Sequence, residues 1–336
     1  MKLLMWNCRG LGTASAIRSL KDVVSSSSPQ IIGLVETKTN NSKWQLIRSI
    51  LGFQNCFSIS PRGRSGGLAI LWRNDIDVTI RNYSFHHIDF TVKHIVEFRA
   101  TLFYGAPMAS QRFNSWNLMR RLSQLSSLPW CIFGDFNEIL RYSEASRNAT
   151  NRTHFIGQFK AAVRDCSLSD LGYKGYRYTY SNRRRGFQET RCRLDRALVC
   201  QEWRSMFPHA TVTHLVAHHS DHCPILIQLR SDTKWQNDVF HFETMWLRDP
   251  HLPSIVTNAW RARSDNCTSF VSRMSHVSKC LQNWNRRSFG NVNLKLKQLK
   301  DELISVRQRA RNSVTVDREH FLVRHIDEWL HREEPM

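Results

Sequence analysis

Short apolar runs of the sequence repeatedly end on a polar residue of a type that can do chemistry. The five segments are "LLMWNCRG" with Asn7, "IIGLVETK" with Glu36, "LFYGAP" with Tyr104, "WCIFGDFNEIL" with Asp135 and Asn137, and "RLDRALV" with Asp195. Each run has the length of a β-strand, so each polar residue is expected at or just after the carboxyl end of one. Strand ends commonly carry sites, because a rigid sheet fixes the side chains while their polar heads stay accessible.

The carboxylates and amides of this set could bind a metal ion or move protons. Glu36 offers the hard oxygen ligands that Mg²⁺ prefers, with water and phosphate filling the rest of its shell. Asp135 and Asn137 would point the same way if their strand continued, which would aim an acceptor and a donor at one reactant. Simpler explanations also exist: Glu36 as an exposed turn residue, Asp135 as an Asp turn, Asn7 as a helix cap and Tyr104 as a core aromatic.

A cluster of histidines precedes the last apolar run of the first part of the chain. In "HLVAHHSDHCPILIQL" (residues 214–229), the polar residues are His218, His219, Asp221 and His222. The absence of a His-Glu-x-x-His pattern and of Cys-x-x-Cys pairs disfavours a zinc site. The consecutive Ser-Asp-His and the lack of a Gly-x-Ser-x-Gly turn disfavour a serine hydrolase. No Gly-x-x-x-x-Gly-Lys loop is present to bind a nucleotide.

The charge balance favours a polyanionic partner. The chain has 48 Lys and Arg against 28 Asp and Glu, a net charge of +20. Residues 1–230 hold 31 basic and 15 acidic residues, and residues 231–336 hold 17 and 13, so the basic surplus lies mainly in the first part. A basic surface binds phosphates favourably because the condensed counterions are released.

Cysteine usage and hydropathy indicate an intracellular protein that does not enter a membrane. The nine cysteines form no Cys-x-x-Cys pair, and their odd number suits no closed disulfide framework. Trp6, Asn7 and Arg9 interrupt the apolar start before a signal-peptide core could form. No run approaches the ~18 uncharged apolar residues that a membrane span needs. The "RRR" run at residues 183–185 hints at nuclear targeting, and we expect an intracellular protein, nuclear or cytosolic, with the nucleus favoured.

The first part of the chain, residues 1–230, is predicted to be one α/β domain. Ten candidate strands and about four helical patterns indicate large, partly antiparallel sheets that are covered by helices. The strand candidates are residues 2–6, 31–36, 66–72, 77–80, 88–92, 97–105, 130–135, 193–199, 210–216 and 223–229. The helix candidates lie near residues 13–27, 42–51, 112–127 and 153–167.

Residues 231–336 are predicted to form a helical extension. The segment "SDTKWQND" (231–238) has the composition of a linker. Apolar residues then recur at helical spacing over 270–284, with Gly290 as a helix stop, and again over 296–306. Two or three heptad steps are too few for a coiled coil, so we expect a helical hairpin packed on itself.

Taken in order, the polar segments resemble the motif series of the endonuclease/exonuclease/phosphatase superfamily. "RLDRALV" and "SDHCPI" look like its apurinic/apyrimidinic endonuclease branch. More closely, the endonuclease domain of plant non-LTR (LINE-type) retrotransposons is similar to "MWNCRGLG", "VETK", "SGGLAILW", "FGDFNEIL", "YTYSN", "RLDRALV" and "HHSDHCPI". "FHFETMWLRDP", "LQNWNRRSFGN" and "LKLKQLKDEL" resemble the connector between that endonuclease and a reverse transcriptase. The resemblance covers nearly the whole chain.

The resemblance implies a four-layer α/β sandwich, with two mixed β-sheets flanked by helices. It also implies Mg²⁺-dependent cleavage of DNA phosphodiesters that leaves a 3'-hydroxyl, with Mn²⁺ as an alternative ion. By the family's pattern, Glu36 binds the metal, which neutralises charge developing on the phosphoryl group. Asp221 completes the carboxylates near the metal, and Asn7 and Tyr104 position the phosphate.

The same resemblance gives the proton-transfer roles to four residues. Asp135 orients or deprotonates the attacking water, assisted by the side-chain amide of Asn137. His222 donates a hydrogen bond to a phosphoryl oxygen in the transition state, and Asp195 holds its ring in the required tautomer.

The resemblance also divides the histidine cluster and exposes two departures. Ser220 is expected to hold the turn, and His218 and His219 to be loop residues with at most a phosphate contact. The corresponding segment of apurinic/apyrimidinic endonucleases is similar to "WNxDG", with an acid two residues after the asparagine, whereas this chain has Arg9 there. A cation in place of this carboxylate could weaken metal binding or favour contacts with the phosphate instead. No Tyr-x-Asp-Asp polymerase signature follows, so we expect a truncated or domesticated element product.

Two other functions stay open at the level of sequence. One is a phosphatase of the same superfamily that acts on inositol phosphates or lipids, which the basic charge also permits. The other is a catalytically silent, nucleic-acid-binding relic whose C-terminal helices serve as an intramolecular or protein-binding surface. Salt-sensitive DNA binding without metal-dependent turnover would select the relic.

Overall fold

The protein folds into two compact units, which are described separately. The structure is a computed structural model that describes residues 1–63, 65–146, 155–184, 188–217, 219–229, 246–247, 249–261, 270–288, 292–309 and 312–332. The first unit is Met1–Asp232 with Arg307–Asp317, and the second is Thr233–Val306 with Arg318–Met336. The division at residue 230 stays a prediction. The predicted linker 231–238 and Gly290 lie outside the described residues.

Two mixed sheets form the body of the first unit. One contains β1 (Lys2–Asn7), β2 (Ile31–Val35), β3 (Asn55–Ile59), β4 (Leu68–Trp72), β10 (Lys174–Gly175), β14 (Thr211–His214) and β15 (Ile225–Gln228). The other contains β5 (Asp77–Ser84), β6 (His87–Lys93), β7 (Glu97–Tyr104), β8 (Trp130–Asp135), β9 (Ser169–Asp170) and β13 (Asp195–Val199). Their strand orders are β10-β14-β15-β1-β2-β4-β3 and β5-β6-β7-β8-β13-β9. The pairs β1/β2, β7/β8 and β10/β14 are parallel.

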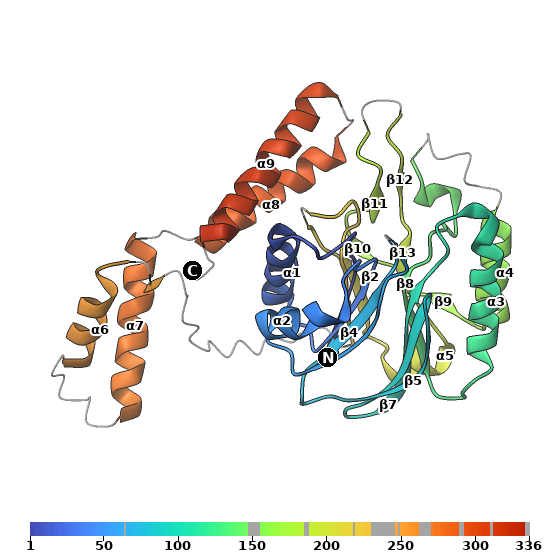
Figure 1. Ribbon diagram of the computed structural model, residues 1–336, viewed down its shortest axis with the longest axis horizontal. Helices are drawn as coiled ribbons and strands as arrows, with labels where there is room; N and C mark the ends of the chain where they lie inside the picture. Colours follow the sequence, from blue (N-terminus) through green and yellow to red (C-terminus); the bar gives the residue numbers. More distant parts are fainter. Residues whose placement is uncertain are drawn as a thin grey trace. The chain divides into compact units, whose positions relative to one another are not determined.

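Helices cover the outer faces of both sheets, so the unit has four layers (Figure 1). The covering helices are α1 (Ala14–Ser27), α2 (Asn41–Leu51), α3 (Arg112–Ser123) and α4 (Ile156–Asp165), whereas α5 (Gln201–Met206) packs Trp203 into the core between the sheets. Two short 3-10 helices, η1 (Ala109–Gln111) and η2 (Tyr142–Glu144), and a two-stranded ribbon of β11 (Tyr180–Ser181) and β12 (Arg191–Cys192) complete the unit. The predicted four-layer sandwich is confirmed.

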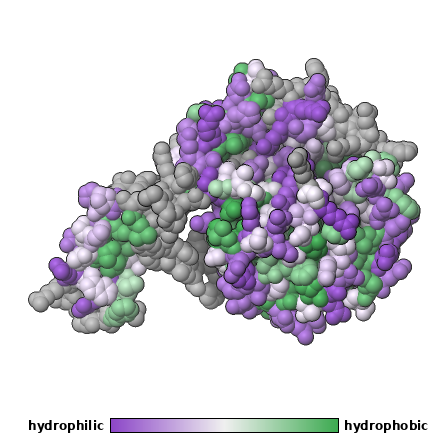
Figure 2. Space-filling model, in the orientation of Figure 1, coloured by the Kyte–Doolittle hydropathy of each residue, from purple (hydrophilic) through white to green (hydrophobic). Residues whose placement is uncertain are grey.

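Apolar cores hold these layers together. The central core lies between the sheets and contains side chains from both, such as Met5 and Ile225 from one and Phe133 from the other. A second core joins α1 and α2 to the first sheet, and a third joins α3 and α4 to the second. The central strands are therefore buried on both faces, which explains their nearly continuous apolar sequences. Figure 2 shows hydrophilic residues interspersed with hydrophobic ones on the visible face of this unit.

All ten strands predicted from the sequence are present, and so are the four helices. The sequence patterns missed β3, whose residues are only half-buried and alternate with polar ones. They also missed the two-residue strands, which are too short for any periodicity, and the six-residue helix α5. No helix among the described residues is long and apolar enough to cross a membrane.

The strand register sets three polar residues side by side. Tyr104 lies opposite Asp135 in the parallel β7/β8 pair, and Asp195 lies opposite Asp135 in the antiparallel β8/β13 pair. The expectation that Asp195 follows the carboxyl end of its strand is wrong, because Asp195 begins β13. It reaches the same edge of the sheet because β13 runs against β8.

A second expectation about this edge is also wrong. The strand β8 ends at Asp135 and does not continue through Asn137, whose φ is 54°. The side chains of Asp135 and Asn137 therefore do not share one face through strand alternation.

The second unit is helical, as predicted for the extension. It contains α6 (Leu252–Arg261), α7 (Phe270–Ser288) and most of α8 (Val292–Gln308) and α9 (Ser313–Arg332). The helices α6 and α7 contact each other through the rings of Trp260 and Phe270, whose centroids are 5.8 Å apart. Arg318 on α9 pairs with Glu302 on α8, at 2.6 Å between Nη2 and Oε1. The spacing argument found α7 and α8 but missed their partners α6 and α9.

The end of α8 belongs to the first unit and contacts its loops. The Arg307 guanidinium donates to the carbonyl of Ala217 at 3.0 Å, and the Tyr176 hydroxyl donates to the carbonyl of Arg307 at 3.3 Å. Arg191 Nη2 donates to the carbonyl of Arg309 at 2.8 Å. These bonds tie residues from the C-terminal part of the sequence to the loop that leads into the histidine cluster.

The close approach of β7 and β8 gives a testable consequence at Gly134. A Cβ atom there would lie 1.8 Å from the carbonyl oxygen of Phe103, so any side chain would push the two strands apart. We expect Gly134→Ala to lower the free energy of unfolding by more than about 3 kcal/mol, measured by urea denaturation.

A matched glycine supplies the control. Gly157 is exposed in α4 and has no atom within 4 Å of an added Cβ. Gly157→Ala should therefore be neutral or gain roughly 0.5–1 kcal/mol from helix propensity. Equal stability of the two variants would contradict the register that aligns Tyr104 with Asp135.

Candidate active site

Five of the predicted site residues meet at one end of the two sheets. Asn7 ends β1, Tyr104 ends β7, Asp135 ends β8, and Asp195 begins β13. Glu36 directly follows β2. All five are buried, with no more than 6% of any residue exposed. Segments that are far apart in the sequence therefore present their polar heads at a common point.

The side-chain amide of Asn7 joins the two sheets. Its Nδ2 donates to Glu36 Oε1 at 3.1 Å and to Asp135 Oδ2 at 2.9 Å. The Tyr104 hydroxyl donates to the same oxygen of Glu36 at 3.0 Å. Burial alone would raise the pKa of Glu36, but Asn7, the charge of Arg9 and the other donors lower it overall. Glu36 is therefore not an exposed turn residue and Asn7 does not cap α1, whereas Tyr104 is a core aromatic whose hydroxyl also joins this hydrogen-bonded group.

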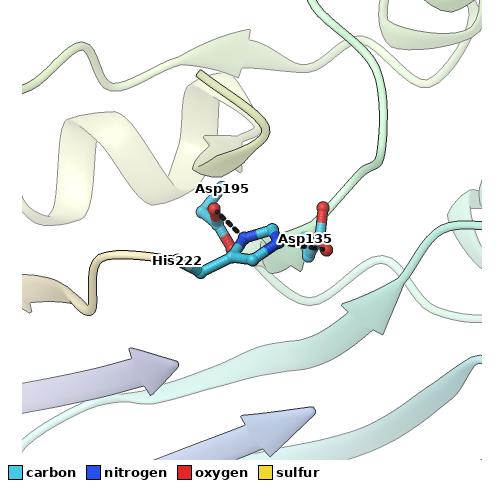
Figure 3. A group of neighbouring side chains, drawn as sticks. All are labelled: Asp135, Asp195 and His222. Atoms are coloured by element: carbon cyan, nitrogen blue, oxygen red, sulfur yellow. Dashed lines mark hydrogen bonds and ion pairs between the residues drawn. The ribbon is translucent and has the colours of Figure 1, made fainter. Parts of the chain in front are cut away.

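His222 lies between two aspartates (Figure 3). Its Nδ1 is 2.9 Å from Asp195 Oδ2, and its Nε2 is 3.9 Å from Asp135 Oδ2. Burial alone would lower the pKa of His222, but the charges of Asp195 and Asp135 raise it to about 9. Burial and the charge of Asp195 raise the pKa of Asp135 as well. At neutral pH a protonated His222 offsets the charge of this buried carboxylate pair.

Neighbouring residues hold His222 in this position. Ser220 Oγ donates to the carbonyl of Asn7 at 2.7 Å and accepts from the backbone N–H of His222 at 3.1 Å. The indole of Trp6 donates to the carbonyl of His222 at 3.0 Å. The ring of Tyr180 lies beside the imidazole, with centroids 5.0 Å apart. Ser220 thus holds the turn, as the sequence predicted, whereas Tyr180 was missed.

The position of Asp195 is fixed mainly through its backbone. Thr179 Oγ1 accepts from the backbone N–H groups of Leu194 and Asp195, at 2.9 and 3.0 Å. Only one carboxylate oxygen of Asp195 bonds to His222, and the other, Oδ1, is buried without a hydrogen-bond partner in the described part of the chain. Thr179 was not predicted as a site residue, although it lies in the "YTYSN" segment.

Two arginines flank Asp195 and anchor it to the scaffold. Arg193 Nη1 is 3.0 Å from Glu144 Oε1 and 2.8 Å from Asp170 Oδ2. Arg196 Nη2 is 2.8 Å from Glu144 Oε2, and its Nη1 is 2.9 Å from Asp170 Oδ2. Burial alone would raise the pKa of Asp170, but Arg196 and Arg193 lower it to about 2. Asp170 is therefore charged at neutral pH.

Asn137 closes the strand end at Asp135. Its backbone N–H donates to Asp135 Oδ1 at 2.8 Å, and its Nδ2 donates to the carbonyl of Gly105 at 2.8 Å. The Asp turn considered as the simpler explanation is present, and it orients Asp135 within the site. The side-chain amide of Asn137 holds the neighbouring loop.

Two cations lie beside the remaining carboxylates. Arg9 Nε is 3.2 Å from Asp221 Oδ1, and Arg9 Nη1 is 3.5 Å from Glu36 Oε2. Lys38 Nζ is also 3.5 Å from Glu36 Oε2. Asp221 therefore belongs to the site through Arg9. Lys38 was missed by the sequence analysis, where its only signal was its place in "VETK".

His218 and His219 are the other two histidines of the cluster. His219 is half-buried in the loop before Ser220, and His218 lies outside the described residues. The phosphate contact expected for them stays a prediction.

Several site residues adopt a left-handed backbone conformation. The φ angles are 53° for Arg9, 53° for Glu36, 49° for Lys38 and 54° for Asn137. Residues with a Cβ rarely adopt this region, and each such residue costs on the order of 1–3 kcal/mol. Such strain is typical of places where the chain must aim particular side chains.

The groups present fit a hard divalent cation. Glu36 and Asp221 offer the carboxylate oxygens that Mg²⁺ prefers. Asp135, Asp195 and His222 also have ligand atoms within 4.8 Å of one another. Because Nδ1 of His222 already bonds to Asp195, and a hard ion favours oxygen, the Glu36 side is the better place for such an ion.

The role of Asn7 as a bridge predicts a graded loss of stability. In buffer with EDTA, Asn7→Ala should lower the free energy of unfolding by about 1–3 kcal/mol, because two buried carboxylates lose their donor. Asn7→Asp should cost more, because it adds a third carboxyl group beside them. Tyr104→Phe should cost less than either, because Glu36 keeps its bond to Asn7. A urea denaturation series in which Asn7→Asp matches Tyr104→Phe would contradict the bridge.

Comparison with known proteins gives one family and several similar folds. The sequence matches the endonuclease/exonuclease/phosphatase family over residues 5–222. A search of curated proteins gave no match. The structure resembles the endonuclease domain of TRAS1, a telomere-specific non-LTR retrotransposon, with a TM-score of 0.51 at 14% identity over 69% of this chain and 99% of that one.

Two bacterial and archaeal structures are similar to the same extent. For the 3'-5' exonuclease (NExo) from Neisseria meningitidis the TM-score is 0.53 at 18% identity, over 69% of this chain and 100% of that one. For an AP endonuclease from Archaeoglobus fulgidus it is 0.54 at 15% identity, over 68% and 98%. At such identities the likeness concerns the fold alone. The family match, by contrast, runs through the segments that carry every candidate site residue from Asn7 to His222, and the chain belongs to the endonuclease/exonuclease/phosphatase family.

Proposed function

We propose that the protein is a Mg²⁺-dependent DNA endonuclease that nicks one strand and leaves a 3'-hydroxyl end. The observation that carries the proposal is the buried arrangement of His222 between Asp195 and Asp135, at 2.9 and 3.9 Å. This arrangement supports a site in which an acid and a base would act on one reacting group, in a chain of the endonuclease/exonuclease/phosphatase family. The surplus of basic residues supports a nucleic-acid substrate.

The Glu36 side of the site would hold the divalent ion. Glu36 and Asp221 would be its protein ligands, and Mn²⁺ could replace Mg²⁺ because it accepts the same oxygen donors. When bound, the ion supplies charge neutralisation for the phosphoryl group and its leaving oxygen.

Asp135 would act on the attacking water. Its raised pKa makes it a better proton acceptor than an ordinary exposed aspartate while it remains largely ionised at neutral pH. The backbone N–H of Asn137 holds Oδ1 of Asp135, and Asn7 holds Oδ2. Both donors fix the carboxylate before substrate arrives, so Asn137 assists through its backbone and not through its side-chain amide.

His222 would donate a hydrogen bond to a phosphoryl oxygen as negative charge develops there. Asp195 accepts from Nδ1, which directs Nε2 and its proton into the site. The raised pKa of His222 keeps that proton in place at neutral pH. Asn7 and Tyr104 would position the phosphate, since their donors already point at the carboxylates around it.

The origin and the partners of the chain form part of the proposal. The ordered series from "MWNCRGLG" to "HHSDHCPI" supports an origin in a plant LINE-type retrotransposon, and with it a nuclear location and DNA as the partner. For the C-terminal helices we propose an intramolecular role. Its support is the hydrogen bonding of Arg307 and Arg309 to Ala217, Tyr176 and Arg191.

Plasmid nicking tests the proposed activity. The wild-type protein should convert supercoiled plasmid to the open circle with Mg²⁺ and not with EDTA. Asp135→Ala and His222→Ala should each lower the nicking rate about 10²- to 10⁴-fold, because each removes a proton-transfer or charge-stabilising group. The nicked product should prime a DNA polymerase, which requires a 3'-hydroxyl.

Controls separate this activity from a contaminant and from the other functions. Gly157→Ala, which changes an exposed helix position far from these residues in the sequence, should nick like the wild type. Equal nicking by all variants would overturn the proposal. Phosphate release from inositol phosphates or lipids without nicking would instead favour a phosphatase. Salt-sensitive DNA binding with no metal-dependent turnover would favour a silent binding protein.

A further inference from the structure

A single guanidinium connects the two carboxylates that would bind the divalent ion. Arg9 reaches Glu36 Oε2 with Nη1 at 3.5 Å and Asp221 Oδ1 with Nε at 3.2 Å. The other oxygen of Glu36 accepts from Asn7 and Tyr104, so Oε2 is the oxygen left for an ion. Arg9 therefore lies at the carboxylate pair where a cation is required.

The backbone at Arg9 indicates that this position is under constraint. Arg9 follows β1 in the left-handed region, with φ of 53°, and its backbone N–H donates to Asn7 Oδ1 at 3.3 Å. Asparagine, aspartate and glycine tolerate this region better than arginine does. The strained backbone at Arg9 thus directs its long side chain toward Glu36 and Asp221.

The guanidinium of Arg9 and a divalent ion would compete for these carboxylate oxygens. Both are attracted by the same negative charge, and two cations that share one carboxylate oxygen repel each other. The side chain of Arg9 is 47% exposed, whereas that of Glu36 is 8% exposed. The side chain of Arg9 therefore has room to turn toward solvent, whereas Glu36 is held in place by its hydrogen bonds from Asn7 and Tyr104. Lys38, which is 35% exposed, contacts Glu36 but has no contact with Asp221 among its ion pairs in the described residues.

We propose that Arg9 is a resident cation that neutralises Glu36 and Asp221 until a divalent ion displaces it, and that the displaced guanidinium then binds the substrate phosphodiester. This inference rests on the proposed function, since it takes Glu36 and Asp221 as the ion's ligands. It makes Arg9 a residue that sets ion affinity and couples ion binding to substrate binding. Arginine suits the second role, because its planar fork matches phosphate geometry.

Ion binding measured without substrate tests the first half of the proposal. Mn²⁺ titrated into the protein and followed by electron paramagnetic resonance should bind Arg9→Ala about tenfold more tightly than the wild type. Arg9→Asn, which suits the left-handed backbone, should show the same gain and covers the case in which Arg9→Ala folds poorly. Lys38→Ala should show a smaller gain, since Lys38 contacts one of the two carboxylates.

The control is an arginine with the same charge and no place in the site. Arg81 is exposed on β5, and Arg81→Ala removes one positive charge from the same unit. Its Mn²⁺ affinity should stay within about twofold of the wild type. Unchanged or weaker binding in both Arg9 variants would overturn the proposal, and so would an equal gain in Arg81→Ala.

DNA binding tests the second half. With Ca²⁺ as the ion, Arg9→Ala should bind a short duplex several-fold more weakly than the wild type, because the displaced guanidinium is missing. In EDTA the two proteins should differ less than about twofold, because Arg9 is then held by the carboxylates. An equal loss under both conditions would overturn the coupling.

The outcomes also separate this inference from the proposed function. If no variant binds Mn²⁺, the assignment of Glu36 and Asp221 as ligands fails, and the inference fails with it. If the wild type nicks plasmid and Glu36→Gln abolishes Mn²⁺ binding, while the Arg9 variants keep wild-type affinity, only the inference fails.

Discussion

The site depends on one amide group, the side chain of Asn7, which donates to carboxylates from both halves of the sandwich. Glu36 follows a strand of the seven-stranded sheet, and Asp135 ends a strand of the six-stranded sheet. Without a donor between them, two buried negative groups would repel each other across the junction of the sheets. The amide of Asn7 offsets that repulsion by donating a hydrogen bond to each carboxylate. The same two hydrogen bonds therefore join the two sheets and fix the geometry of the site.

Burial makes the charges of this site interdependent. The charges of Asp195 and Asp135 raise the pKa of His222, and the charge of His222 in turn acts to lower the pKa of Asp135. Arg9 and Lys38 pair with Glu36 and offset its negative charge on the more exposed side of the site. Each carboxylate thus has a cation near it before any ion or substrate arrives, and a ligand that enters must exchange with one of these partners.

The elements of the fold could be predicted from the sequence, whereas the pairing of most strands could not. Strands such as β8 are buried on both faces, so their apolar runs stand out clearly. Asp195 was expected at the carboxyl end of a strand although its apolar run follows it, and no sequence pattern showed that β13 runs antiparallel to β8 and so brings its first residue beside Asp135. The residue types of the site were found because carboxylates, amides and a histidine stand beside apolar runs in an ordered series along the chain. Lys38 and Thr179 were missed because only the folded chain brings such ordinary residues to Glu36 and Asp195.

Asp195 shows how the fold meets the cost of a buried carboxylate away from the reacting atoms. One of its oxygens bonds to His222 and the other has no hydrogen-bond partner within the described residues, so its side chain alone would hold it poorly. The precision comes from the backbone, which Thr179 and the ion pairs of Arg193 and Arg196 fix on either side. Removing one partner of such a buried pair costs about 3–5 kcal/mol, so the network resists displacement. Asp195 can therefore orient His222 even though its second carboxylate oxygen accepts no hydrogen bond from the described residues.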